Sequence, residues 1–80
     1  MNKEIIDNIN WRKEELKRQL QITENRAFEI RKSIQRMATS CSVYDIKREV
    51  ENLERTTYEC LDIKKRISLL NDLLLEDEFY

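Results

Sequence analysis

The sequence predicts an all-α fold, an antiparallel two-helix hairpin of the coiled-coil type that dimerises into a four-helix bundle. Its 80 residues include no Gly and no Pro, and 39% are charged and 40% hydrophobic, which is the composition of long helices. Apolar residues recur every seven positions in both halves of the chain. A single cluster of small polar residues lies near the middle, so one short turn is expected between two helices of similar length.

The first helix is expected from about residue 3 to about residue 38. Two positions of each heptad are expected to face the other helix, along a line of contact that we call the seam. Of the eleven residues at these positions in the first helix and the start of the turn, nine are apolar. The exceptions are Lys13 and Thr23, which we interpret as breaks in the stripe. A strict seven-residue repeat implies a left-handed supercoil. The predicted core residues of this helix are Ile9, Leu16, Leu20, Ile30 and Ile34.

The turn is expected at about residues 39–42 and the second helix at about 43–77. Ser42 and Asp45 have the spacing of a capping box, with Asp in place of the usual Glu. We expect Val50 to lie beside the core residues early in this helix. The predicted core residues, spaced by seven or by multiples of seven, are Leu53, Cys60, Ile67 and Leu74.

Together the two helices form one domain over residues 1–80. In an antiparallel hairpin, residues whose numbers sum to about 82 lie opposite each other, which pairs Leu20 with Ile63 and Leu16 with Ile67. The alternative is one continuous helix of about 120 Å in a parallel coiled coil. A chain of this size buries only about 60% of its unfolded surface, so oligomerisation is expected to add stability.

The composition argues against an enzyme. Phosphate-binding loops and dinucleotide fingerprints need glycines, and histidine-based catalysis or metal ligation needs His; the chain has neither. A carboxylate site would need acidic residues in the core, whereas the acids lie mostly off the apolar stripes. We therefore expect no catalytic residue, no metal and no cofactor.

Apolar residues that the hairpin seam cannot use indicate a binding surface. From residue 61 onward apolar side chains surround the second helix almost completely, and Trp11 and Ile22 lie off the stripe of the first helix. Homodimerisation and docking of a different protein would each cover such a surface, and the two are compatible. The predicted partner-binding residues are Trp11, Ile22, Tyr58, Leu69, Leu73, Phe79 and Tyr80.

These features predict a non-enzymatic protein-protein interaction module, a small inhibitor, adaptor or antagonist that occludes or tethers another protein. The alternatives are a structural assembly or scaffolding coiled coil and a nucleic-acid-associated transcriptional regulator. Residues 1–40 hold nine basic and six acidic residues and residues 41–80 six and ten, and folding the chain back mixes these halves. With a net charge of -1 the chain lacks the basic footprint of a nucleic-acid binder.

Location and source are expectations from composition alone. The N-terminal residues include acids and no apolar run of signal length, and the longest apolar run is residues 73–75, so neither a targeting segment nor a membrane span is expected. Two unpaired cysteines suit the cytoplasm. A bias toward Ile, Lys, Asn and Glu with only two Ala residues is typical of AT-rich genomes, which indicates a bacterial or bacteriophage source.

Overall fold

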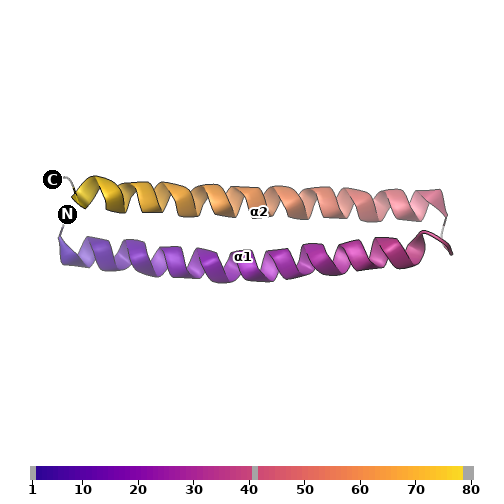
Figure 1. The fold of residues 1–80 in the computed structure, drawn as a ribbon, viewed down its shortest axis with the longest axis horizontal. Coiled ribbons are helices and arrows are strands. Elements are labelled where there is room, and N and C mark those ends of the chain that lie inside the picture. Colours follow the sequence, from indigo (N-terminus) through magenta and orange to yellow (C-terminus); the bar gives the residue numbers. More distant parts are fainter. Residues whose placement is uncertain (1, 41, 79–80) are drawn as a thin grey trace.

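The protein is a long hairpin of two antiparallel helices. The computed structural model describes residues 2–40 and 42–78, in which α1 spans Lys3–Met37 and α2 spans Val43–Glu78. The two helices lie side by side along their whole length, and the start of α1 and the end of α2 lie at the same end of the hairpin (Figure 1). The molecule measures 59 × 15 × 12 Å. The predicted all-α antiparallel hairpin is therefore confirmed, and the alternative of one continuous helix is wrong.

Each helix begins at a side chain that caps its free backbone N–H groups. Asn2 precedes α1 and its side-chain oxygen accepts a hydrogen bond of 2.9 Å from the N–H of Ile5. Ser42 precedes α2, and its hydroxyl accepts from the N–H of Asp45 at 3.3 Å while donating to the Asp45 carboxylate at 3.0 Å. In a capping box the carboxylate accepts from the backbone N–H of the N-cap residue. Here the Asp45 carboxylate instead accepts from the hydroxyl of Ser42.

On the α1 side of the turn the described residues need no glycine, because none of them has a positive φ angle. Ala38 ends α1 in the right-handed helical region, with φ at -58° and ψ at -28°. Ser40 then continues the last turn of the helix, as its N–H donates to the carbonyl of Met37 at 3.2 Å and its hydroxyl to that of Arg36 at 3.3 Å. These bonds satisfy carbonyls that the end of a helix leaves free.

The seam between the helices follows the heptad repeat. The residues predicted for the core all face it, and except for Cys60 each of them is only half-buried. The prediction for Val50 is wrong, because the structure leaves Val50 exposed and places the half-buried Glu49 nearer the seam. Glu49 follows Ile46 by three residues and precedes Leu53 by four, so it completes the repeat that Val50 misses by one position.

The most deeply buried residues lie near the middle of the hairpin, and we call these four small residues the waist. Thr23 and Ala27 of α1 and Thr56 and Cys60 of α2 are the buried residues of the described part of the chain. Both threonine hydroxyls donate to a carbonyl four residues earlier in their own helix, at 2.7 and 2.9 Å, so neither is buried without a partner. Small side chains allow two helices to approach closely.

Thr23 therefore fits the seam, where the sequence pattern had indicated a break. Lys13, the other expected break, is half-buried at the other seam position of the α1 heptad. Outside the waist the larger seam residues keep part of their surface in solvent, and no large side chain of the described chain is fully buried. The hairpin thus has a narrow core of small residues with incompletely covered aliphatic residues on both sides of it.

Candidate protein-interaction surface

Four large apolar side chains remain exposed outside the seam, three of them towards the open end of the hairpin and the fourth, Ile22, at the level of the waist. We call Trp11, Ile22, Leu69 and Leu73 the open-end patch. Trp11 and Ile22 of α1 are each 61% exposed and Leu69 of α2 is 55% exposed. Leu73 follows Leu69 by one helical turn. A pair of helices can bury only the stripe that each turns toward the other, so residues off that stripe stay in solvent.

Trp11 and Leu69 line one groove of 530 Å³ between the two helices. The half-buried residues Leu16 and Leu70 lie at the same groove, so its apolar lining comes from both helices. The charged residues at the groove are Arg12, Glu15 and Arg66. An apolar centre with a charged rim is the usual composition of a protein-binding surface.

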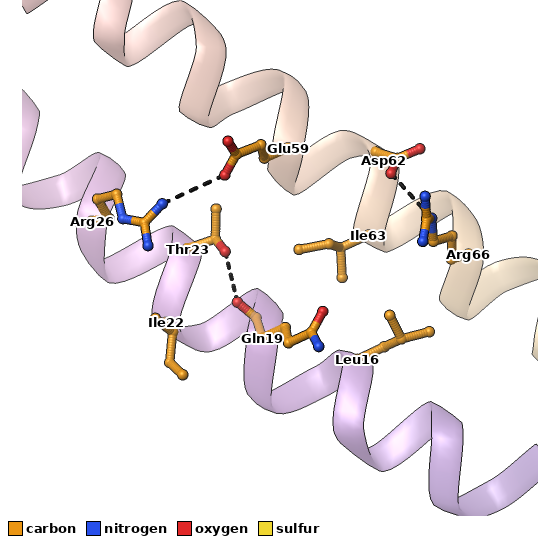
Figure 2. Close-up of a pocket in the computed structure, with 9 residues that line it drawn as sticks. All are labelled: Leu16, Gln19, Ile22, Thr23, Arg26, Glu59, Asp62, Ile63 and Arg66. Atoms are coloured by element: carbon orange, nitrogen blue, oxygen red, sulfur yellow. Dashed lines mark hydrogen bonds and ion pairs between the residues drawn. The ribbon is translucent and has the colours of Figure 1, made fainter.

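A second hollow, of 350 Å³, continues the groove toward the waist and shares Leu16 and Arg66 with it (Figure 2). Leu16 and Ile63 reach toward each other between the helices, whereas Ile22 points away from α2 (Figure 2). Ile22 lies eleven residues after Trp11 in α1, at the level of the waist. It lengthens the patch along α1, and its side chain is directed away from α2 (Figure 2).

The polar residues of this hollow are held by short-range pairs. Arg26 reaches across to Glu59 with 3.6 Å between the guanidinium nitrogen and the carboxylate oxygen, and Arg66 Nε lies 3.1 Å from an oxygen of Asp62 (Figure 2). Arg26 and Glu59 form the one ion pair that joins the two helices among the side chains the structure describes, residues 2–40 and 42–75. Both side chains of this pair are about half exposed, which limits its contribution to stability.

The remaining predicted binding residues do not join this patch. Tyr58 is exposed, but it lies two positions from both Thr56 and Cys60 and therefore on the side of α2 that faces away from α1. Phe79 and Tyr80 lie outside the described residues. The structure thus brings Trp11, Leu69 and Leu73 to one end of one face, with Ile22 farther along it.

The residues predicted for an oligomer core lie in the seam of the hairpin itself. Their buried surface is covered by the partner helix, and their remaining exposed surface is what a further chain would cover. Cys60 differs from the others because it is buried at the waist, where its thiol is free.

Sequence reasoning missed Phe28, which forms with Leu61 a second exposed pair on the other side of the seam. Both side chains are more than half exposed and line a groove of 430 Å³ whose lining includes the waist residues Ala27 and Cys60. Phe28 falls off the heptad stripe of α1, the same signal that identified Trp11. Lys32 Nζ lies 4.6 Å from the centre of the Phe28 ring, which is a cation–π distance.

Neither a metal site nor a membrane span is found. Within the described ranges, no group of three or more His, Cys, Asp or Glu residues is placed to hold a metal ion. Neither helix, as far as it is described, is long and apolar enough to cross a bilayer.

The comparisons with known proteins leave these surfaces as the guide to function. No protein-family model, no curated protein and no solved structure matches the chain.

Proposed function

We propose that this chain is a non-enzymatic protein-protein interaction module, a small inhibitor, adaptor or antagonist that binds another protein through the open-end patch. The observation that carries the proposal is the groove between Trp11 and Leu69, where two exposed side chains flank apolar residues from both helices. Large apolar and aromatic residues around a groove are the groups that contribute most to protein binding energy. The hairpin would act by occluding its partner or by tethering it.

The charges around the groove favour a protein partner over a nucleic acid. Arg12 and Arg66 are the basic residues at the groove, and Arg66 is already paired with Asp62. Phosphate binding needs several unpaired cations on one surface. Near the turn, Lys32 lies 3.9 Å from Glu29, so basic residues there are also interleaved with acids.

The proposal includes a homodimer with four helices in its core. Supporting it, the buried residues of the described chain are the four small ones of the waist, and the larger seam residues are only half covered by the second helix. A second hairpin would cover those that lie within the contact, and small folds commonly gain stability in this way. We place the protein in the cytoplasm, where the buried thiol of Cys60 would stay reduced.

The open-end patch can be tested with the chain's single tryptophan as the reporter. A photo-crosslinking residue at position 69 would capture the partner in cells of the source organism, and the purified partner would then be titrated onto the hairpin. We expect a blue shift of Trp11 emission on binding, because its ring moves from solvent into an interface. The Trp11→Ala/Leu69→Ala variant should lower the affinity at least tenfold, and Tyr58→Ala on the outer side of α2 serves as the control.

The proposal is wrong if Trp11→Ala/Leu69→Ala leaves both the oligomer mass and the binding of the captured partner unchanged. Circular dichroism of the variant would establish that its helices are intact. Loss of partner binding with the oligomer unchanged would support the patch as the docking site. Equal loss in the Tyr58→Ala control would contradict it.

A scaffolding role is the second candidate, and the groove at Phe28 and Leu61 favours it. The hairpin has apolar grooves on both sides of the seam. If the groove on one side bound the groove on the other side of the next molecule, the contact would not close into a dimer and further molecules could add. This candidate predicts growth beyond a dimer as the protein concentration rises. Light scattering over a wide concentration range would detect such growth, and a constant dimer mass would contradict it.

A further inference from the structure

The groove at Phe28 and Leu61 has the features of a self-complementary surface, and we call it the waist groove. Its lining includes Ala27 and Cys60, whose side chains are small and buried, with the larger Phe28 and Leu61 beside them. Phe28 is 52% exposed and Leu61 55% exposed. The surface thus presents a large apolar side chain directly beside a hollow with a small-residue lining. Such a surface can receive the same side chain from an identical molecule.

The charges at the waist groove lack partners within the hairpin. Glu24 and Arg31 both line it, seven residues apart, with Phe28 between them. The residues three and four positions from each of them, on either side, are all uncharged, so neither has a helical ion-pair neighbour. No ion pair involving either residue is formed among the described side chains. On an antiparallel second copy the same two charges run in the reverse order along the helix. Glu24 of one copy can therefore lie opposite Arg31 of the other.

We propose that the waist groove binds the waist groove of a second copy about a two-fold axis that passes between Ala27 and Phe28. The axis places Glu24 of each copy opposite Arg31 of the other, and sets the two Phe28 rings side by side over the small residues. Because a two-fold contact is isologous, each such pair occurs twice. This inference rests on the homodimer in the proposed function and specifies the surface and register of that dimer.

The second helix agrees with this register. At the level of Ala27, antiparallel pairing places α2 at residues 55–56, and the exposed residues Val50 and Leu61 are equally far from that level in the two directions. The same two-fold axis therefore brings Val50 of one copy toward Leu61 of the other, an apolar pair. By the same count Lys64, at the rim of the groove, falls at the level of Lys47 of the other copy and adds no ion pair to the contact. With a net charge of -1 per chain, overall repulsion does not oppose the contact.

This arrangement leaves the open-end patch accessible in both copies. The axis lies closer to the turn than to the open end, so the halves that contain the turns overlap and the open ends project in opposite directions. Trp11 and Leu69 lie on the other side of the seam from the waist groove. The dimer would accordingly present two separate binding sites for the partner of the proposed function.

Charge reversal tests the register, because it changes the order of the charges and leaves the apolar residues in place. Sedimentation velocity over a wide concentration range would compare the wild type with Glu24→Arg, Arg31→Glu and the double variant. Each single variant sets like charges against each other twice per dimer, and we expect the dissociation constant to rise about tenfold or more. The double variant restores opposite charges, and its constant should return to within about threefold of the wild-type value. Lys65→Glu, on the outer side of α2, is the matched control and should have no effect.

Three results would overturn the inference. Single variants that dimerise as tightly as the wild type would place the dimer on another surface, while the homodimer itself would stand. Loss of the dimer in Trp11→Ala/Leu69→Ala, with the charge variants unaffected, would assign it to the open-end patch. A wild-type chain that stays monomeric at every concentration would remove both this inference and the proposed homodimer.

Discussion

Replacing Ala27 by Leu tests whether the waist is where the helices pack most closely. Ala27 is 4% exposed, beside other small residues, and no large side chain of the described chain is fully buried. A leucine there adds three carbon atoms to a close-packed site. Overpacking of this kind costs about 1–3 kcal/mol of the free energy of unfolding, because neighbouring side chains or the helix backbones must move. The intrinsic helix propensities of Ala and Leu are close, so propensity contributes little to the change.

Thermal unfolding followed by far-UV circular dichroism would measure this loss. For a domain of this size each 1 kcal/mol lowers Tm by about 4–8 °C, so a loss of about 1–3 kcal/mol predicts a fall of about 4–24 °C. All samples need the same protomer concentration, since self-association makes Tm depend on concentration. The matched control is Ala38→Leu, the same substitution at the exposed C-cap of α1, which should change the free energy of unfolding by less than about 0.5 kcal/mol.

The reasoning about the waist would be refuted if Ala27→Leu unfolded within about 0.5 kcal/mol of the wild type. The helices would then have room for a larger residue at this level, and the small residues would need another explanation. An increase in stability would be a stronger contradiction, because it would mean that Ala27 leaves a cavity.

Three further predictions concern the threonines, the cap of α2 and the ion pair between the helices. Thr56→Val should leave the free energy of unfolding unchanged or raise it by up to about 1 kcal/mol in urea unfolding, because the hydroxyl bonds only a carbonyl of its own helix; a loss above about 1 kcal/mol would contradict this. Ser42→Ala should cost about 1 kcal/mol, since the N–H of Asp45 loses its acceptor, and hydrogen exchange should accelerate in the first turn of α2. Glu59→Gln should cost less than about 1 kcal/mol, because both Arg26 and Glu59 are about half exposed to screening solvent, and high salt should reduce the difference from wild type further.

The sequence determined the fold because the seam of a two-helix hairpin is a local property of each helix. Apolar residues every seven positions mark the side of the helix that faces its partner, and this requires no knowledge of where the partner lies. The central cluster of small polar residues likewise indicated the turn. The expected helices, at about 3–38 and 43–77, compare with Lys3–Met37 and Val43–Glu78 in the structure. Asn2 is of a residue type that commonly caps helices, and its side chain caps α1.

Part of the candidate surface could also be predicted. Trp11, Leu69 and Leu73 were identified because they exceed what one seam can bury, and the structure places them towards one end on one side of it. Phe28 also lies off the heptad stripe and was missed. It is an isolated apolar residue of α1, whereas the apolar residues that indicated a surface are clustered towards the open end. Tyr58 was assigned to the same surface, but its position in the heptad directs it away from α1.

Only the tertiary structure decided how deeply each seam residue is buried. Thr23 is buried at the waist, whereas larger aliphatic residues in the same row of α1 are only half-buried, although the sequence pattern ranks these residues in the opposite order. Periodicity fixes the direction of a side chain, but burial depends on the distance to the other helix and on the residues that meet at that level. Small residues from both helices meet at the waist and close the gap, and this pairing depends on the register of the folded hairpin.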